Sequence, residues 1–381
     1  MLIMEFLGSM RPEHDGTTRV AFRMRTGFKQ SGARHLYVSP IVATSDNEDM
    51  RKVFSMPVPF STGYRLSLCR TSAIRTLLRE QKPDLIHIHS PCTLGFAAVK
   101  AARSLGIPVV ATFHTHFPSY LKYYKVGFLV PLAWKYFRSL YNLCETVIVP
   151  SQAMLEVLNA QGFKNLVCIP HGVDTQKFSP ALRSKSWREN LGCEGKIVVL
   201  FAGRLVWEKN IGILPRILAL VTHKEQIEVV IAGDGPARAK LQTMMPKARF
   251  LGHLSAEDLA VAYASSDVFV MPSLTETFGN VTVEAMASGL VPICAAAGGA
   301  CDLIQSGKNG FLVAPNNAQD CAQAIDKVVE NSALRNTLMQ EALASAPRYC
   351  WEETIKKYQY IYRTVMNTPL DIGTELNVQK A

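Results

Sequence analysis

The chain has 381 residues, 48% of them hydrophobic and 19% charged, which is enough for two globular domains with separate cores. No apolar run reaches the ~20 residues that span a bilayer, and the first apolar stretch is too short, and broken too early by Glu5, for a secretory signal. The nine cysteines include no CxxC pair, so we expect a reducing, cytoplasmic setting without a disulfide framework or a structural zinc.

Positive charge is concentrated in the first half of the chain. Residues 1–176 contain 20 Lys and Arg against 11 Asp and Glu, whereas the remainder contains 21 against 20. Such an imbalance indicates either an anionic partner (nucleic acid, a membrane surface or an acidic acceptor) or a solvated basic surface. The sequence has no groove-reading or base-stacking motif, so we expect no nucleic acid partner.

The first half alternates short Val- and Ile-rich runs with helix-length segments such as Thr93–Leu105 and Gln152–Gln161. The runs are apolar without strict alternation, as expected of strands that are covered on both faces. This order predicts right-handed crossovers and a parallel sheet. The predicted strands of this half are LIMEF at 2–6, HLYVSPIV at 35–42, PDLIHIH at 83–89, IPVVATFH at 107–114, ETVIVP at 145–150 and LVCIP at 166–170.

The segment Pro170–Pro180 is rich in turn formers and is the predicted domain boundary. A second alternating series follows, with predicted strands KIVVLFAGR at 196–204, IEVVIAGDG at 227–235, ARFLGH at 248–253, DVFVMP at 267–272, VPIC at 291–294 and NGFLV at 309–313. We therefore predict an α/β protein with two Rossmann-like doubly wound domains, residues 1–172 and 173–350, which face each other across a cleft. A closing helix covers about 351–366, and residues 367–381 are predicted to be a polar tail.

Two cations follow the first strand of the second series, in VVLFAGRLVWEKN. Gly203 and Arg204 end the strand, and Lys209 is predicted to open the next helix. Arg presents a fork to two oxygens and Lys adds a point charge, so the pair suits a diphosphate. A surface Arg and Lys that pair with Glu208 would give the same pattern. The turn AGDGP then offers Gly233 for close backbone approach to a ligand, although one Gly-x-Gly is a weak signal.

The stretch SLTETFGNVTVEAMASG places two carboxylates around a predicted helix start. The backbone N–H groups near Phe278, Gly279 and Asn280 are expected to bind a phosphate, because a helix N-terminus attracts anions. Glu276 lies before the helix and Glu284 more than one turn inside it. Acids beside a phosphate site are tolerated if they accept hydrogen bonds from sugar hydroxyls, so the stretch suits a nucleotide diphosphate sugar.

These motifs resemble the donor site of the family-4 retaining glycosyltransferases with the GT-B fold, over about residues 1–366. The resemblance implies that Arg204 and Lys209 hold the diphosphate, that Glu276 lies beside the donor sugar and that Glu284 binds the ribose. It also implies that the closing helix crosses back onto the first domain. Transfer with retained configuration is implied, with no metal and no cofactor; the substrate is GDP-mannose or a UDP-hexose.

The first half resembles family members that build mannose linkages or use lipid acceptors. In ATFHTHFPSYLKYY the resemblance places His114 beside the sugar, and His116 less securely; a histidine satisfied by backbone at a strand end is the alternative. The first loop departs from the family's Gly-Gly pair, since it has Asp15 before Gly16. Gly16 still permits close backbone approach to the donor, but the role of Asp15 is open.

The predicted activity is transfer of a hexose, with mannose favoured, to a hydroxyl of a lipid or glycan acceptor. The alternatives are a UDP-sugar-dependent glycolipid synthase (glucosyl or sulfoquinovosyl) and a non-catalytic nucleotide-sugar-binding protein. The aromatic and lysine-containing segment Phe117–Phe137, with Arg19–Gln30, is consistent with peripheral contact to the cytoplasmic face of an anionic membrane. An ordinary helix pair with core aromatics and solvated charges is equally consistent.

Overall fold

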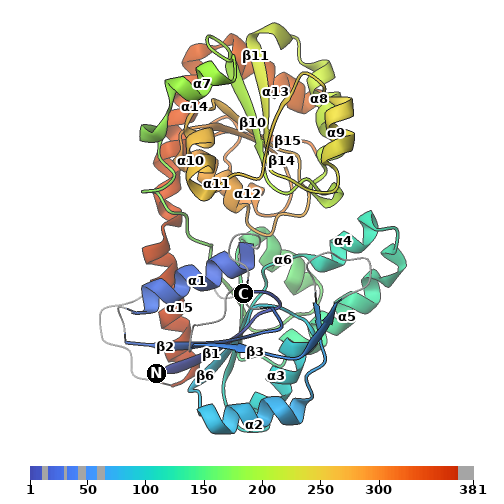
Figure 1. Ribbon diagram of the computed structural model, residues 1–381, viewed down its shortest axis with the longest axis vertical. Coiled ribbons are helices and arrows are strands. Elements are labelled where there is room, and N and C mark those ends of the chain that lie inside the picture. The colour runs from blue at the N-terminus through green and yellow to red at the C-terminus, as the bar shows by residue number, and fades with distance from the viewer. Residues whose placement is uncertain (11–15, 30–31, 42–48, 58–64, 368–381) are drawn as a thin grey trace. The chain divides into compact units, whose positions relative to one another are not determined.

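The protein consists of two compact α/β units in a computed structural model that describes residues 1–10, 16–29, 32–41, 49–57 and 65–367 (Figure 1). The N-terminal unit comprises the described parts of Met1–Pro118, Phe128–His171 and the chain from Trp351 onward. The C-terminal unit comprises Ser119–Gly127 and Gly172–Cys350. The prediction of two doubly wound domains is confirmed at the level of the fold in each unit.

A seven-stranded parallel sheet forms the centre of the N-terminal unit, in the order β3-β2-β1-β6-β7-β8-β9. Its strands are β1 (Leu2–Phe6), β2 (Arg34–Ser39), β3 (Met50–Lys52), β6 (Leu85–Ile88), β7 (Val109–Thr112), β8 (Thr146–Val149) and β9 (Leu166–Cys168). The strand order reverses between β1 and β6, and such a reversal is where ligands bind in open α/β sheets. Sequence analysis missed β3 and the hairpin of β4 (Ser55–Pro57) and β5 (Arg65–Ser67).

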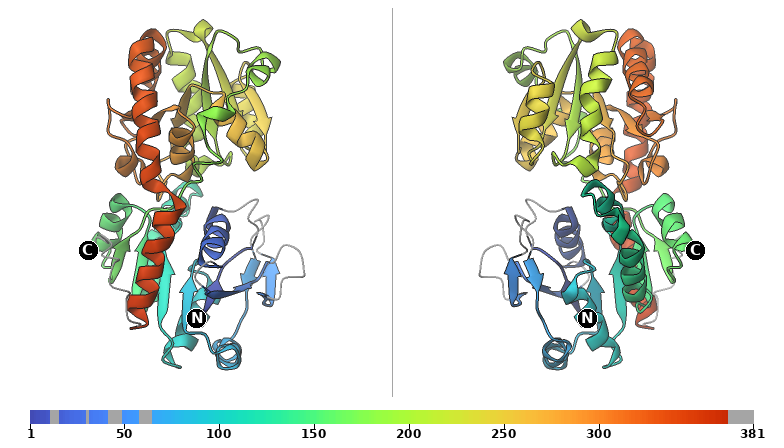
Figure 2. Two further views of the ribbon diagram at one scale, coloured as in Figure 1. Left: turned by 90° about the vertical axis from the view of Figure 1, so that its left-hand side faces the viewer. Right: turned by 90° about the vertical axis from the view of Figure 1, so that its right-hand side faces the viewer.

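Helices cover both faces of this sheet. They are α1 (Gly16–Lys29), α2 (Thr71–Gln81), α3 (Thr93–Arg103), α5 (Val130–Tyr141), α6 (Gln152–Ala160) and α15 (Trp351–Val365); α4 (Phe117–Tyr123) crosses from one unit to the other. On one face, Met24 and Phe28 of α1 pack with Tyr358 and Tyr362 of α15. The closing helix therefore belongs to the core of the N-terminal unit, and the side views show it alongside that unit's strands (Figure 2). The other face packs against α2, α3, α5 and α6.

The C-terminal unit has a six-stranded parallel sheet in the order β12-β11-β10-β13-β14-β15. Its strands are β10 (Ile197–Ala202), β11 (Ile227–Ala232), β12 (Arg249–Gly252), β13 (Val268–Met271), β14 (Val291–Ala295) and β15 (Phe311–Val313). Its helices are α7 (Lys185–Asn190), α8 (Leu214–Leu220), α9 (Arg238–Met244), α10 (Ala256–Ala264), α11 (Asn280–Ala287), α12 (Ala300–Leu303), α13 (Ala318–Glu330) and α14 (Ser332–Ser345). All six predicted strands are present, and the strand order reverses between β10 and β13.

Among the described residues, no helix is both long and apolar enough to cross a membrane.

Candidate functional site

The predicted donor residues lie at the strand-order reversal of the C-terminal unit. Gly203 and Arg204 follow β10, and the loop that contains Glu276 follows β13, which is the neighbouring strand. Because the carboxyl ends of parallel strands share one edge of the sheet, residues about 70 positions apart in sequence meet there. The order of the strands thus brings Arg204 and Glu276 to the same edge of the sheet.

Glycines allow the backbones of three loops to approach one another at this edge. A Cβ atom at Gly233 would lie 1.9 Å from the carbonyl oxygen of Gly203, and one at Gly235 would lie 2.5 Å from that of Leu205. Both glycines also have φ values that other residues rarely adopt, +141° and +155°. The AGDGP turn is therefore a close backbone contact with the loop after β10, which no other residue type fits.

Lys209 and Glu276 form an ion pair of 2.5 Å between Nζ and Oε1. Both side chains are mostly buried, 19% and 11% exposed. Burial acts to raise the pKa of Glu276, but the charge and hydrogen bond of Lys209, with help from Ser273 and Arg204, hold that pKa below its ordinary value. Glu276 is therefore a carboxylate, able to accept hydrogen bonds but not to donate one.

The prediction that Lys209 opens a helix is wrong. Trp207–Lys209 forms a 3-10 turn, which ends because Asn210 adopts a left-handed φ of +56°. This turn directs Lys209 at Glu276. The alternative of a surface pair required Lys209 to contact Glu208 instead. Arg204 does approach Glu208, at 3.9 Å, but remains 52% exposed, so its guanidinium is accessible to a ligand.

The helix α11 begins where the sequence placed it, within one residue. Gly279 precedes the first helical residue, Asn280, with a φ of +101°, a left-handed conformation that favours glycine. Phe278 is buried and packs edge-on against Tyr349. Glu284 lies inside the helix, is largely buried and accepts a hydrogen bond from the Tyr263 hydroxyl at 3.3 Å.

Sequence analysis missed two glycines that support this loop. A Cβ atom at Gly298 would lie 2.2 Å from the carbonyl oxygen of Glu276, and one at Gly299 would lie 2.2 Å from that of Phe278. The Gly299 N–H also donates to the Glu276 carbonyl at 2.9 Å. The Gly-Gly pair in AAAGGA was the available signal, since paired glycines after a strand often mark close backbone approach.

His114, predicted to be catalytic, and Gly16, predicted to bind the donor, belong to the N-terminal unit. Gly16 is the first residue of α1, and Asp15 lies outside the described residues. His114 follows β7 by two residues, as predicted, and is largely buried. Its Nε2 atom lies 2.9 Å from Nδ1 of His89, so the backbone-satisfied alternative does not describe it fully. The His116 ring lies 5.3 Å from the Trp134 ring.

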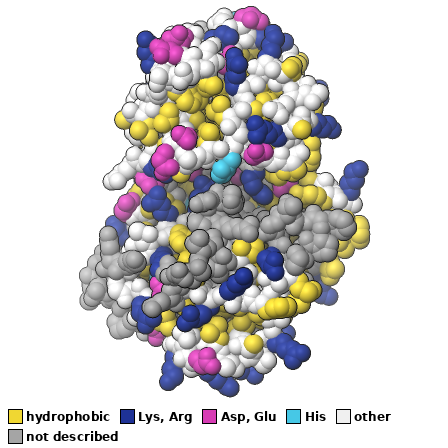
Figure 3. Space-filling view, in the orientation of Figure 1, with side chains coloured by type: hydrophobic (Ala, Val, Ile, Leu, Met, Phe, Trp, Pro, Cys, Tyr) yellow, Lys and Arg dark blue, Asp and Glu magenta, His cyan; other side chains and the backbone are white. Residues whose placement is uncertain are grey.

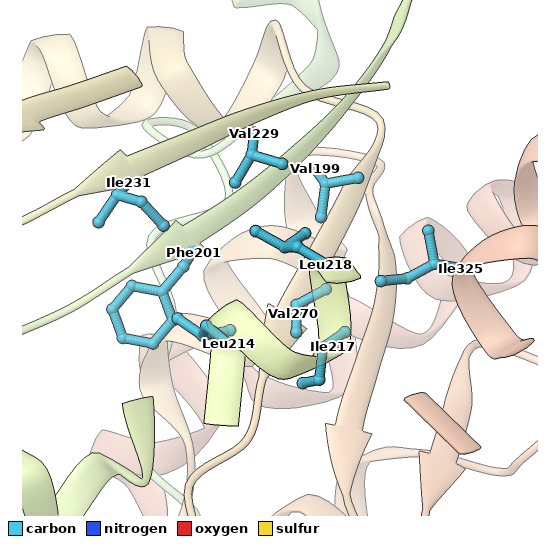
Figure 4. A pocket seen from close by; sticks show the side chains of 9 residues that line it. All are labelled: Val199, Phe201, Leu214, Ile217, Leu218, Val229, Ile231, Val270 and Ile325. Carbon is cyan, nitrogen blue, oxygen red and sulfur yellow. The ribbon is translucent and has the colours of Figure 1, made fainter. Parts of the chain in front are cut away.

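A second region of the C-terminal unit, an apolar gap, is lined by no charged or polar side chain among the described residues. It lies within the core between β10, β11, β13, α8 and α13, and the side chains that line it are all hydrophobic (Figure 4). They are Val199, Phe201, Leu214, Ile217, Leu218, Val229, Ile231, Val270 and Ile325. We assign it to core packing.

Comparison with known proteins shows which family the chain belongs to. Residues 14–177 match the description "Glycosyltransferase Family 4" and residues 184–344 match "Glycosyl transferases group 1". The chain is 34% identical to a GDP-mannose-dependent alpha-mannosyltransferase of Corynebacterium glutamicum (80% of this chain, 75% of the relative) and 35% to one of Mycobacterium tuberculosis (80% and 82%). It is also 35% identical to sulfoquinovosyl transferase SQD2 of Arabidopsis thaliana, in an alignment that covers 80% of this chain and 61% of the relative.

Solved structures share the fold at low identity. A UDP and glucose complex of Anabaena Alr3699/HepE superposes with a TM-score of 0.76 at 21% identity, over 96% of this chain and 100% of that one. Sucrose-phosphate synthase from Thermosynechococcus elongatus gives 0.77 at 19% identity, over 96% and 99%. The fold is the GT-B fold, and the protein belongs to the family-4 glycosyltransferases, as a hexosyltransferase.

Proposed function

We propose that this protein transfers a hexosyl group, with mannosyl favoured, from a nucleoside diphosphate sugar to a hydroxyl of a lipid or glycan, with retention of configuration. The observation that carries the proposal is the Lys209–Glu276 pair beside the exposed Arg204 and the start of α11. Two cations and a helix N-terminus suit a diphosphate, and an ionised carboxylate in the same loop suits sugar hydroxyls.

In the proposed reaction the bond from the anomeric carbon to the diphosphate breaks, a bond to the acceptor oxygen forms, and the proton of the acceptor hydroxyl passes to the leaving diphosphate. The leaving diphosphate gains negative charge, which Arg204, Lys209 and the N–H groups around Gly279 stabilise. Glu276 accepts hydrogen bonds from the sugar, and Glu284 accepts from the ribose. Gly203 and Gly233 let the backbones of the loops after β10 and β11 meet beside the donor, and in the N-terminal unit His114 acts on the sugar, with Gly16 near the donor.

The ion pair also implies an exchange of partners when the donor binds. Lys209 is paired with Glu276, with 2.5 Å between Nζ and Oε1. A diphosphate competes for Lys209, and the sugar hydroxyls then satisfy the carboxylate. We propose that these cations replace a metal ion, so turnover in EDTA is expected to equal turnover with magnesium; a rate that disappears in EDTA would contradict this.

Mannose is favoured as the transferred sugar because two relatives at 34–35% identity are named GDP-mannose-dependent alpha-mannosyltransferases. The relative named for sulfoquinovosyl transfer is equally similar, so a glycolipid synthase that uses a UDP-sugar is the second candidate. Thermal unfolding with GDP, UDP and ADP separates the two. A nucleotide at ~100 times its dissociation constant stabilises the folded state by about 2.7 kcal/mol.

The matching activity test measures release of the nucleoside diphosphate and the anomer of the product. Lys209→Ala and Glu284→Ala are expected to lower turnover at least tenfold, as a rough estimate from the loss of charge-assisted hydrogen bonds. Lys247→Ala removes an exposed lysine of the same unit and serves as the control. Near-wild-type turnover in both site variants would overturn the site assignment, and no shift with any nucleotide would overturn donor binding.

We further propose that the protein contacts an anionic lipid surface through residues 125–135, most of which belong to the N-terminal unit. Phe128 and Leu132 are 78% and 63% exposed, an uncommon state for large apolar side chains, and Lys125 and Lys135 are exposed beside them. The visible face of this unit carries Lys and Arg side chains among hydrophobic ones (Figure 3). By contrast, Met24 and Phe28 of α1 are core residues, so these two side chains are not part of the proposed membrane face.

A further inference from the structure

A carboxylate is buried where the N-terminal sheet reverses its strand order. Glu5 is 0% exposed near the end of β1, in a strand whose other residues are apolar. It lies in register with Tyr37 of β2 and His87 of β6. Side chains alternate along a strand, so Glu5 points to the same face as Ile3, the face that α1 and α15 cover. A buried charge is costly unless paired, so its presence here requires an account.

Histidines surround this carboxylate. His35 Nδ1 lies 2.9 Å from Glu5 Oε1, while Nε2 of His89 hydrogen-bonds the other oxygen, Oε2. His87 Nδ1 lies 3.5 Å from Oε2. Burial acts to raise the pKa of Glu5, but these three histidines hold it well below its ordinary value. Glu5 is therefore a carboxylate, and His35 Nδ1 and His89 Nε2, which hydrogen-bond it, are the donors.

His89 links the carboxylate to His114. Its second nitrogen, Nδ1, lies 2.9 Å from Nε2 of His114, and the two rings are stacked with centroids 5.2 Å apart. The three side chains come from the ends of β1, β6 and β7, which are adjacent strands. One hydrogen-bonded chain therefore runs from Glu5 through His89 to the histidine that the proposed function assigns to the donor sugar.

The other two histidines do not continue this chain. His87 hydrogen-bonds the Tyr362 hydroxyl at 2.5 Å and Thr112 Oγ1 at 2.8 Å, which ties the sheet to α15. His35 contacts Glu5 from the opposite side. The group Glu5, His87 and His89 is close enough together to surround a metal ion. However, the direct hydrogen bond between His89 and Glu5 leaves no space for an ion between those two atoms.

We propose that Glu5 and His89 are positioning residues that set the tautomer and orientation of His114. The carboxylate requires a proton on Nε2 of His89, so in neutral His89 the Nδ1 atom is an acceptor. His114 then donates its Nε2–H to His89, and its Nδ1 atom carries the lone pair. This proposal rests on the proposed function only for the role of His114 in transfer.

Such an arrangement prepares His114 to accept a hydrogen bond from a sugar hydroxyl. Burial, together with His89 and His171, holds the pKa of His114 well below its ordinary value, so the ring is neutral. Positive charge that develops on the His114 ring is shared with His89 and stabilised by Glu5. The same logic applies wherever a carboxylate orients a functional imidazole through its other nitrogen.

Kinetics on the full-length protein test this link. Glu5→Gln retains the volume and an acceptor oxygen but removes the charge, and we expect about tenfold lower kcat with a donor KM within about twofold of wild type. In a His114→Ala background the same substitution should have almost no further effect, because its influence passes through that ring. His35→Gln, which contacts the same carboxylate off the chain, is the control and should keep wild-type kcat.

Two outcomes of these kinetics would overturn the proposal. One is an equal loss of kcat in His35→Gln, which would mean that the buried network only stabilises the core. The other is an undiminished effect of Glu5→Gln when His114 is already alanine. If Glu5→Gln does not fold, His89→Gln interrupts the chain at its middle and is judged by the same criteria.

A spectroscopic measurement decides the tautomer without any activity. Histidine-selective ¹⁵N labelling, with His114 assigned by comparison with His114→Gln, should show a protonated Nε2 and an unprotonated Nδ1 in the wild-type protein. In the Glu5→Gln variant, the His114 ring should no longer be held in this single tautomer. A protonated Nδ1 in the wild type, or stoichiometric metal that Glu5→Gln removes, would overturn the proposal. Absence of transfer from every donor would refute the proposed function and leave this measurement decisive.

Discussion

Replacement of Gly299 by alanine tests whether the loop containing Glu276 depends on the turn after β14. The new Cβ atom would lie 2.2 Å from the carbonyl oxygen of Phe278, and ordinary contacts begin near 3.4 Å. The backbone would have to yield by about 1.2 Å to relieve the contact. Because Gly299 has an ordinary φ of −62°, the substitution adds the clash without backbone strain.

The expected effect on activity follows from that displacement. A misplacement of about 1 Å in a reactive arrangement costs about 100-fold in rate, so kcat/KM should fall by about two orders of magnitude. The stability cost should be smaller, since overpacking typically costs about 1–3 kcal/mol. For a unit of this size, each kcal/mol lowers Tm by about 2–4 °C. Donor turnover and thermal unfolding are measured on the same preparation.

Gly307→Ala is the matched control for stability. Gly307 has a left-handed φ of +82° and nothing within 4 Å of its would-be Cβ, so alanine there introduces strain of about 1–2 kcal/mol without a clash. We expect a similar loss of Tm with wild-type kcat/KM. Turnover of Gly299→Ala within twofold of wild type, or an equal activity loss in Gly307→Ala, would refute the role given to this turn.

Two further predictions concern the ion pair and the proposed membrane face. Lys209→Met should destabilise the protein at pH 7, because the Glu276 carboxylate loses its partner. The folded pKa of Glu276 lies below its ordinary 4.5, so the stabilisation that the ion pair gives the wild type is lost as pH falls from about 4.5 through the folded pKa. The difference in Tm between wild type and Lys209→Met should therefore narrow over that pH range. A constant difference would contradict this. The double variant Phe128→Ser/Leu132→Ser should co-sediment less with anionic liposomes than the wild type, and high salt should also weaken the binding. The control variant Leu182→Ser, at another exposed leucine, should bind as the wild type does. Equal binding by the wild type, the double variant and the control would refute the membrane face.

The parallel strands were predictable because their signal is local. LIMEF and IEVVIAGDG each contain a complete buried strand, recognisable from apolar residues at consecutive positions. The start of α11 was predictable for the same reason, since a glycine before a helical segment is a local signal. The short strand β3 was missed because its three residues, MRK, are largely exposed and have no apolar pattern.

By itself, then, the sequence determined the two alternating series, the donor motifs and the family they resemble. Only the tertiary structure decided which motifs meet. Lys209 and Glu276 are 67 positions apart, and Glu5 and His89 are 84 apart. Each pair meets because the order of the strands places their ends side by side. Strand order depends on long-range packing of the sheet, which no local pattern specifies, so the buried chain from Glu5 to His114 became visible only in the folded protein.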